Sequence, residues 1–485
     1  MTTTQDIVQK LWSLCHILRD DGIKYLEYVT ELTFLLFLKM AKETEVEEQL
    51  PEGYRWSDLE SLDGIEQLDF YKKMLIHLGT HGSQRVQDIF TDAQTSLRKP
   101  KNLKKLTEDI DKLDWYSARH EGLGDMYEGL LEKNANETKS GAGQYFTPRP
   151  LIEAMVECLK PQPGETIQDP ALGTGGFLRA ADSYIKANTD ELFDLNERQQ
   201  QFQRRKALIG IELVPDVRRL AQMNLMLRGI DCDILIGDTL SPLGAELPKA
   251  DVILTNPPFG TKKGGGRPTR DDFTYVTSNK QLAFLQHIYR GLKPGGRAAV
   301  VLPDNVLFED NTGQKIRADL MDKCNLHTVL RLPTGIFYAQ GVKTNVLFFQ
   351  RGPAGKETGN TKAVWFFDLR TNMPSFGKRT PFGLEHLKPF LDAYGEDPNG
   401  GSRRKDEGED GRFRKFTRKE ISERSESLDV RWLRDDSEGR TEDLPDPDGI
   451  AAEILLQLQN ATEEIQALVE SLSSDDNDAG MRVSS

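Results

Sequence analysis

The chain has 485 residues, more than one ordinary domain, and is long enough for a large core with two smaller appendages. Its 63 Lys and Arg residues against 77 Asp and Glu residues give a net charge of −14. This balance disfavours a protein that holds nucleic acid unaided across its whole surface. The four cysteines are scattered, with no Cys-x-x-Cys pair and no histidine cluster beside them, so we expect neither a disulfide framework nor a metal site.

The strongest apolar run, residues 32–41, contains Lys39 and is too short to span a bilayer. The N-terminus is polar and lacks a signal-peptide pattern. These features predict a cytoplasmic protein with no membrane partner.

Residues 1–133 are expected to form an N-terminal helical domain. From Asp6 to Lys42 apolar residues recur at helical spacing, which predicts two amphipathic helices hinged near Gly22. Further helical stretches include 65–79 and 123–133. Since no cluster of ionisable residues appears here, a domain that only packs is favoured, and a partner-binding or clamp role stays open.

After residue 134 the helical pattern breaks into the loop KSGAGQYFTPRPL, which carries two aromatic residues and Arg149 before a helix starting near Leu151. Such loops often line sites, although this one alone is weak evidence.

Strands then alternate with helices, which predicts right-handed βαβ units and an α/β, doubly wound parallel sheet. The predicted strands are ETIQD, KALIGIEL, CDILIGD, ADVILTN and RAAVVLP, with helices at 175–185, 215–227 and 281–292. The late pair LHTVLRLP and TNVLFFQ is interpreted as a hairpin at the sheet edge.

The first strand runs into DPALGTGGF, residues 169–177, where closely spaced glycines allow the backbone to approach a ligand as the next helix begins. The second strand ends in Glu212, which can accept hydrogen bonds from ribose hydroxyls, and the third ends in Asp238, placed to meet an adenine amino group. For each acid taken alone, a helix cap or a solvated strand end is the favoured explanation. An NAD-binding fold is the competitor, but its acid follows the first helix within about 20 residues, whereas the insertion at 190–205 pushes Glu212 further away.

The fourth strand runs into Asn256-Pro257-Pro258-Phe259. An amine on a planar ring becomes nucleophilic when acceptors draw its hydrogens out of the ring plane. Asn256 offers a side-chain carbonyl, Pro257 a backbone carbonyl and Phe259 a ring face for stacking. An ordinary Asn-Pro turn is the alternative for this tetrapeptide alone.

In this order, GQYFTPRPL, DPALGTGGF, GIEL, GDTL, NPPF and KTNVLFF resemble the motif set of N6-adenine DNA methyltransferases. More specifically, the chain resembles the modification subunit of type I restriction-modification systems, over most of its length including the helical N-terminal region. One departure is Leu172, where the family more commonly has cysteine.

The resemblance implies an S-adenosylmethionine-dependent methyltransferase fold and methyl transfer to the N6 amino group of a flipped adenine in DNA. Cofactor-binding residues would be a loop that closes over S-adenosylmethionine, the glycine turn and the strand-end acids: Gln144, Tyr145, Phe146, Thr147, Pro148, Arg149, Asp169, Gly173, Thr174, Gly175, Gly176, Glu212 and Asp238. The catalytic residues would be Asn256, Pro257, Pro258 and Phe259, with no general base and no metal.

The implied partners are double-stranded DNA and a separate specificity (S) subunit, with two copies of this chain for each S subunit. A restriction (R) nuclease or translocase subunit is left open as a third. Two alternative functions remain: a protein glutamine N5-methyltransferase, which needs the same acceptors for an amine, and a non-catalytic scaffold that keeps the fold.

The remaining domain boundaries follow from composition. We expect a catalytic domain at 134–352, a polar and loosely structured extension at 353–449, a docking helix at 450–473 and a disordered tail at 474–485. The docking helix is indicated by apolar residues spaced alternately four and three apart between Ile450 and Leu472. The basic, glycine-rich loop at 260–270 fits a phosphate-contacting flap or a solvated loop equally well.

Overall fold

The computed structural model describes residues 4–23, 28–44, 46–115, 147–259, 268–337, 342–374, 376–377 and 380–434. The chain divides into two compact units, which we describe separately. The first unit comprises Met1–Phe146, Leu172–Asp182 and Leu195–Ile236, and the second comprises Thr147–Ala171, Ser183–Asp194 and Gly237–Ser485.

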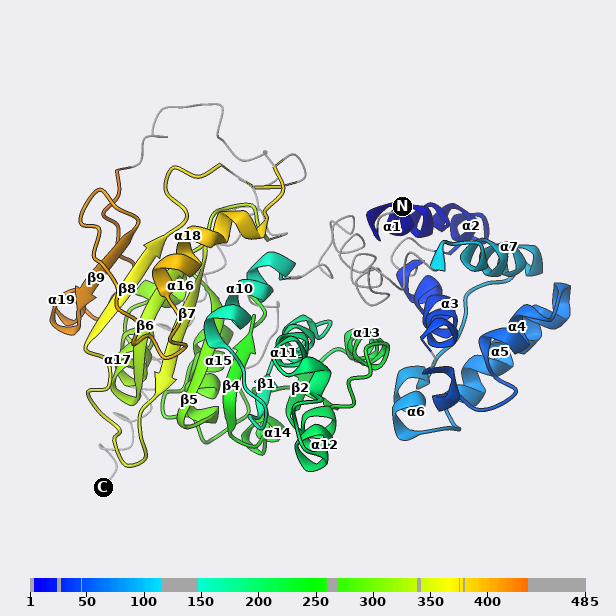
Figure 1. Cartoon of the computed structure of the whole chain (residues 1–485), viewed down its shortest axis with the longest axis horizontal. Coiled ribbons are helices and arrows are strands. Elements are labelled where there is room, and N and C mark those ends of the chain that lie inside the picture. The colour runs from blue at the N-terminus through cyan, green and yellow to red at the C-terminus, as the bar shows by residue number, and fades with distance from the viewer. Residues whose placement is uncertain are drawn as a thin grey trace, which may run out of the picture. The chain divides into compact units, whose positions relative to one another are not determined.

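The first unit begins with short helices, as the apolar spacing predicts (Figure 1). The chain turns at Gly22, whose φ of 80° lies in the left-handed region that glycine tolerates. The first predicted helix is divided at Leu14 into α1 and α2. The helices described in this part of the chain are α1 (Thr4–Ser13), α2 (Cys15–Asp20), α3 (Tyr28–Glu43), η2 (Val46–Gln49), α4 (Trp56–Glu60), α5 (Gly64–Leu78), α6 (Gln84–Phe90) and α7 (Pro100–Asp111).

Helix α13 (Pro215–Met226) belongs to the βα pattern in sequence but packs with these N-terminal helices. Met223, Met226 and Leu227 are members of the same buried apolar cluster as the side chains of α1 to α7. Arg218 forms an ion pair of 2.7 Å with Asp88 of α6. The helical region and the second βα segment therefore share one core. The other elements of this unit are β2 (Leu208–Glu212), β3 (Asp233–Ile236), α12 (Glu197–Arg205) and the start of α11 (Gly176–Ala187).

The strands of the described residues form one sheet of order β3-β2-β1-β4-β5-β7-β6-β8-β9. Strands β2 and β3 are parallel, as are β1 with β4 and β4 with β5, whereas β7 lies antiparallel between β5 and β6. The predicted α/β fold class is confirmed, although the sheet is mixed. The strands of the second unit are β1 (Ile167–Asp169), β4 (Ala250–Thr255), β5 (Leu292–Pro303), β6 (Cys324–Arg331), β7 (Thr344–Arg351), β8 (Ala363–Asp368) and β9 (Phe413–Thr417).

The hairpin predicted from LHTVLRLP and TNVLFFQ is confirmed, because these segments form β6 and β7, which pair antiparallel. Their expected place at the sheet edge is wrong. Strand β8 pairs in parallel with the free side of β6, and β9 pairs with β8, so two later strands extend the sheet.

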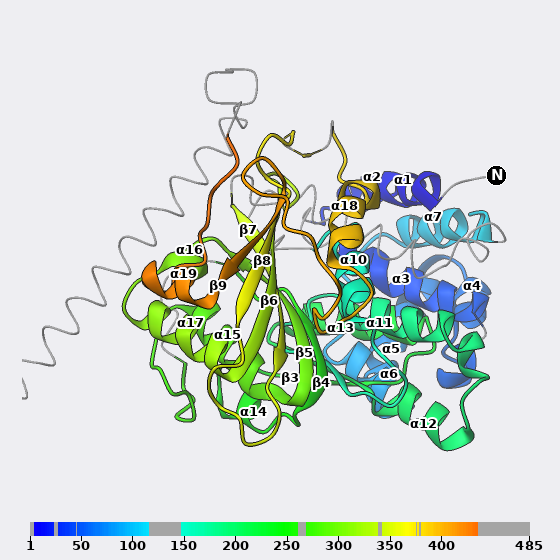
Figure 2. The same cartoon turned by 60° about the vertical axis from the view of Figure 1, so that its left-hand side comes forward.

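Helices cover both faces of the sheet in the second unit. Helices α15 (Lys280–Gly291) and α17 (Thr312–Lys323) lie on one face, and α10 (Arg149–Leu159) and α18 (Leu384–Tyr394) lie on the other (Figure 2). Between them the strands are almost wholly apolar, as in Val300, Val346 and Phe348, all with no exposed surface. The remaining short helices are η3 (Asp190–Leu192), α14 (Pro242–Ala245), α16 (Asn305–Phe308) and α19 (Arg418–Glu423).

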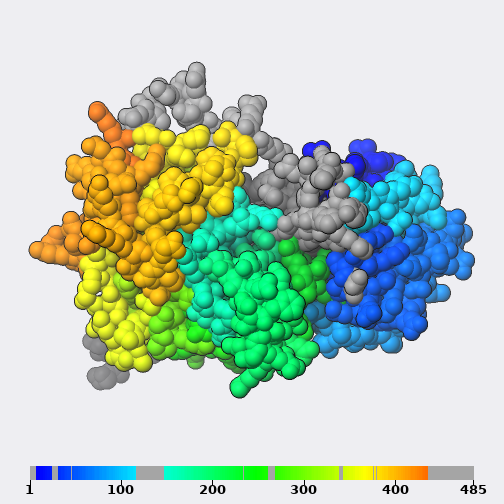
Figure 3. Space-filling view, viewed as in Figure 1, coloured from blue at the N-terminus to red at the C-terminus, as the bar shows by residue number. Residues whose placement is uncertain are grey.

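The segment 353–434 contains more regular structure than its polar composition predicts. Beyond β8, α18, β9 and α19, its loops are held by buried charges: Arg331 of β6 forms an ion pair of 2.9 Å with Asp368 and donates a hydrogen bond to the carbonyl of Val430. The atoms of the segment 353–434 form a continuous yellow and orange surface beside α10 (Figure 3). The predicted docking helix and tail lie outside the described residues.

Candidate active site

The glycine turn follows β1 and leads into α11 in the first unit. Gly173 and Gly175 have φ values of 55° and 82°, both in the left-handed region. A Cβ atom at Gly175 would meet Leu225 of α13 at 3.4 Å. The turn is tied to β2 because the Leu172 amide donates to the carbonyl of Ile211 at 3.1 Å. The sequence therefore builds a tight turn whose surface is backbone rather than side chain.

Leu172, the departure from the family pattern, has a packing role. Its side chain covers Gly210 of β2, where a Cβ atom would meet the leucine Cδ atoms at 2.9 Å. The side chain is 3% exposed. The larger residue is accommodated because β2 has a glycine beneath it.

Glu212 ends β2 and is braced by backbone donors. One carboxylate oxygen accepts a hydrogen bond of 2.9 Å from the Gly173 amide, and the other accepts one of 2.9 Å from the Val214 amide. Burial raises the pKa of the carboxyl above its usual value, and the backbone hydrogen bonds partly oppose this shift. The carboxylate thus links the end of β2 to the glycine turn, and its other lone pairs can accept hydrogens from a ligand.

Asp169 and Asp238 occupy different environments in the second unit. Asp169, 1% exposed, accepts hydrogen bonds from the Ala171 amide at 3.0 Å and from the Thr255 hydroxyl at 2.7 Å, so it joins the ends of β1 and β4. Asp238 is exposed and accepts from the Leu240 amide at 2.8 Å. Only Asp238 has a carboxylate open to solvent.

The segment Asn256 to Phe259 continues directly from β4. Asn256 is 8% exposed, and its side-chain Nδ2 donates a hydrogen bond of 2.8 Å to the Thr147 hydroxyl. The Pro258 carbonyl accepts one of 3.2 Å from Gln281 of α15. Both contacts fix the segment from outside β4. Because Nδ2 of Asn256 donates to Thr147, the oxygen Oδ1 at the other end of the amide is the acceptor atom.

Phe259 is also held by a distant residue. Its ring packs edge to face against Phe337, with centroids 5.8 Å apart and an angle of 79° between the ring planes. Both side chains are 4% exposed. One short segment thus combines an amide oxygen, a proline carbonyl and an aromatic ring, and the distant Phe337 supports that ring. This combination suits recognition of a planar group that carries an amine.

Charges beyond β5 and β7 are neutralised in pairs. Asp304 forms an ion pair of 2.7 Å with Arg370 and accepts a hydrogen bond of 2.7 Å from Asn345. Burial alone would raise the pKa of Asp304, but Arg370 and Asn345 outweigh it and hold the pKa below its usual value. The carboxyl end of β5 and the adjacent amino end of β7 therefore offer polar contacts, with the Asp304 charge matched by Arg370.

The predicted loop over the cofactor is only partly described. Gln144, Tyr145, Phe146 and the loop at 260–267 lie outside the described residues. Pro148 precedes α10, and Arg149 forms an ion pair of 2.8 Å with Glu153.

Three residues of this site were missed by sequence reasoning: Thr255, Gln281 and Phe337. Phe337 lies between two glycines in TGIFYAQG. It is therefore an aromatic residue in a glycine-containing loop, the same weak signal of a site that the sequence shows at Tyr145. Neither Thr255 nor Gln281 has a local signal, because each acts on a residue brought close only by the fold.

Among the described residues, no group of three or more His, Cys, Asp or Glu side chains could hold a metal ion. In the same part of the chain, no helix is long and apolar enough to cross a membrane.

Comparison with known proteins gives consistent matches. The family described as N-6 DNA Methylase matches residues 117–441, and the HsdM N-terminal domain matches residues 7–110. The type I restriction enzyme EcoKI methylase subunit of Escherichia coli K12 is 53% identical and the StySPI methylase subunit of Salmonella potsdam is 52% identical, each over 97% of this chain and 96% of the relative.

Solved structures agree. The EcoKI M protein superposes with a TM-score of 0.58 at 48% identity and 96% coverage of both chains. A protein from work on complex assembly and conformational transition of a type I R-M system gives a TM-score of 0.72 at 28% identity, covering 98% of this chain and 99% of the other. The family predicted from the motifs is confirmed: the chain belongs to the N-6 DNA methylases, as a member of the methylase subunits of type I restriction enzymes.

Proposed function

We propose that the chain transfers a methyl group from S-adenosylmethionine to the N6 amino group of an adenine flipped out of DNA. The observation that carries this proposal is the Asn256 amide, which Thr147 holds by its nitrogen end, three residues before the buried Phe259. Extruding the base from the duplex costs a few kcal/mol, which stacking and hydrogen bonding in the site offset.

The first half of the proposed site would hold the cofactor. The family implies S-adenosylmethionine as the methyl donor, and the residues present fit it. The glycine turn allows close approach of the amino-acid part, the braced carboxylate of Glu212 can accept from the ribose hydroxyls, and the open carboxylate of Asp238 can accept from the adenine amine. Asp169 would fix the start of the turn through Thr255. The loop from Gln144 to Arg149 would close over the cofactor.

The second half would prepare the target amine. When bound, the cofactor supplies an electrophilic methyl group. Asn256 Oδ1 and the Pro257 carbonyl would accept the two amine hydrogens, which draws the nitrogen lone pair out of conjugation with the ring. Phe259 would stack on the base, supported by Phe337. Positioning supplies much of the acceleration, and the extra proton is lost from the methylated nitrogen without a dedicated base.

Replacing Asn256 tests the proposal. Asn256→Ala should lower the single-turnover methylation rate with saturating cofactor by about 10²- to 10³-fold, the loss typical of one preorganised polar contact at a reacting centre. Cofactor affinity and binding to duplex DNA should stay near normal, because phosphate contacts come from elsewhere. The exposed residue Asn188 provides a matched control, and Asn188→Ala should methylate normally. Near-normal methylation by Asn256→Ala would remove the proposal.

We also propose that a separate specificity subunit supplies recognition of the DNA sequence, with two copies of this chain bound to each, and that a restriction subunit can join them. The heptad-spaced apolar residues between Ile450 and Leu472 support a docking segment for such a partner. A chain ending at Asp448 should bind cofactor normally and fail to co-purify with the co-expressed specificity subunit. If the complex survives this truncation, the docking segment lies elsewhere.

A further inference from the structure

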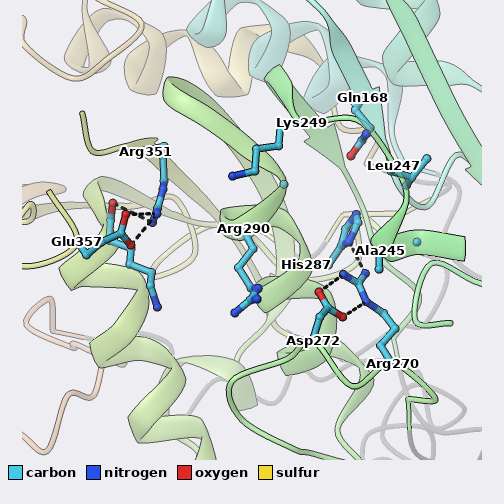
Figure 4. Close-up of a pocket in the computed structure, with 13 residues that line it drawn as sticks. Gln168, Ala245, Leu247, Lys249, Arg270, Asp272, His287, Arg290, Arg351 and Glu357 are labelled. Carbon is cyan, nitrogen blue, oxygen red and sulfur yellow. Dashed lines mark hydrogen bonds and ion pairs between the residues drawn. The ribbon is translucent and has the colours of Figure 1, made fainter. Parts of the chain in front are cut away.

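A pocket of about 340 Å³ opens in the second unit at the amino ends of β4, β5 and β6. Lys249 precedes β4, Gly291 precedes β5, and Arg351 ends the antiparallel strand β7. Figure 4 shows Lys249 and Arg351 among the residues that line the pocket. Asn256 follows the opposite, carboxyl end of β4. The pocket is therefore separate from the residues assigned to methyl transfer.

The lining of this pocket is basic although the chain is acidic. Five cationic side chains face two carboxylates, against a net charge of −14 for the whole chain. Three of the cations are matched by ion pairs of 2.5 to 2.7 Å: Arg270 with Asp272, Arg351 with Glu357, and Lys323 with Asp319.

Two cations have no carboxylate of their own among the described residues, although the charge of Arg290 helps Arg270 to lower the pKa of Asp272. Lys249 is exposed, and Arg290 donates a hydrogen bond of 2.8 Å to the neutral hydroxyl of Thr274. Neither forms an ion pair with any residue that the structure describes. In Figure 4 these two side chains lie between the Arg351–Glu357 pair on one side and the Arg270–Asp272 pair on the other. The middle of the pocket thus carries the unmatched positive charge.

His287 adds a neutral donor whose tautomer is fixed. Its Nδ1 lies 2.7 Å from a guanidinium nitrogen of Arg270. Because arginine has donors only, Nδ1 must accept, and the ring hydrogen must be on Nε2. Burial, together with the charge of Arg270, lowers the pKa of His287 to about 3, so the ring is neutral. The side chain is 3% exposed, and Nε2 has no hydrogen-bond partner within the described part of the chain.

Gln168 of β1 adds a fixed acceptor. Its Nε2 donates to the Pro248 carbonyl at 3.1 Å, which identifies Oε1 as the other end of the amide. Oε1 is buried without a partner among the described residues, and the side chain is 1% exposed. Buried polar atoms are rarely left unsatisfied. A donor and an acceptor that both lack partners, in one basic pocket, indicate a polar ligand.

We propose that this pocket binds a phosphorylated small molecule of nucleotide size. Phosphate oxygens accept hydrogen bonds and carry negative charge, which suits Lys249, Arg290 and the Nε2 hydrogen of His287. The volume is within the range of pockets that bind small molecules and exceeds what a phosphate group alone needs. A hydroxyl or amide donor elsewhere on the ligand would satisfy Gln168.

Calorimetry on the full chain, saturated beforehand with S-adenosylhomocysteine to occupy the proposed cofactor site, tests the inference. Uridine 5′-monophosphate and ribose 5-phosphate should bind saturably at one site, whereas uridine, which lacks the phosphate, should not bind. Because neither probe contains adenine and the cofactor site is filled, the result does not depend on the proposed methyl transfer.

Single variants locate the binding. Lys249→Ala and Arg290→Gln should each weaken the affinity for uridine 5′-monophosphate by about tenfold or more, the loss expected for a hydrogen bond to a charged group. Lys293→Ala is the matched control, since Lys293 lies near the start of β5 but is paired with Asp251 at 2.6 Å. Absence of saturable binding by either phosphorylated probe, or equal binding by all three variants, would overturn the proposal. So would a requirement for Lys249 and Arg290 in binding short duplex DNA while the small phosphates fail to bind, because the ligand would then be nucleic acid.

Discussion

The residues proposed for the cofactor in the first unit and those proposed for the target base in the second unit are held by different means. The cofactor residues that the first unit contributes are a backbone turn at Gly173 and Gly175 and one carboxylate, Glu212, braced by backbone amides. In the second unit, the target half consists of neutral groups, Asn256 and Phe259, each held by a side chain far away in sequence. Backbone turns depend on local sequence, whereas side-chain contacts between distant residues depend on the whole fold. The two halves should therefore fail differently when perturbed.

The largest expected difference between the two units is the loss of stability at low pH, which should fall mainly on the second unit. The second unit contains two buried histidines, His287 and His327, each 3% exposed, and burial lowers the pKa of both to about 3 from 6.5. Below pH 6.5 the unfolded chain binds protons that the folded chain does not. Stability is therefore present in full above pH 6.5 and is lost as the pH falls toward 3, by about 1.4 kcal/mol per histidine for each pH unit.

Hydrogen exchange measured at pH 7 and pH 5.5 would show this loss as reduced protection in the second unit. The substitution His327→Gln should decrease the pH dependence of stability by about one histidine's share, roughly 1.4 kcal/mol per pH unit. An unchanged pH dependence in the His327 variant would contradict the assignment.

The next effect should be confined to the cofactor half. Glu212→Gln keeps the shape of the side chain but removes its charge, so S-adenosylmethionine affinity should fall by about 1.5 to 3 kcal/mol, roughly 10- to 150-fold. At saturating cofactor the methylation rate should recover. Glu197→Gln makes the same change at an exposed residue of the first unit and should bind cofactor normally. A rate defect that persists at saturation would place Glu212 in the chemical step instead.

The smallest effect should be confined to the target half. Thr147→Val removes the hydroxyl that accepts from Asn256 while keeping the volume of the side chain. We expect the single-turnover rate at saturating cofactor to fall by about two- to tenfold, the equivalent of one neutral hydrogen bond. Thr166→Val, a half-buried threonine in the same unit, serves as the control. Weaker cofactor binding by Thr147→Val would instead support the role in the cofactor loop that the family resemblance implies.

The sequence was most informative where a feature is local. Strand β4, the glycine turn and the Asn256 segment were predicted because apolar runs, glycine spacing and strand-end residues appear within a few positions of one another. Strands β8 and β9 were not predicted, because polar neighbours mask them and because the Arg331–Asp368 pair that anchors them joins distant residues. Gln281 and Phe337 were missed because each contacts a residue that is distant in sequence.

Helix α13 has consequences beyond its place in the fold. Its residue Leu225 packs on Gly175 of the glycine turn, while Met223 and Met226 belong to the core of the N-terminal helices. The helical region consequently cannot be removed without effect on the rest of the first unit. Deleting it would expose the apolar side of α13 and leave a surface prone to aggregation. Thermodynamic reciprocity adds a second consequence. A partner that binds the N-terminal helices and thereby shifts α13 must change cofactor affinity, and cofactor must change the partner's affinity by the same factor.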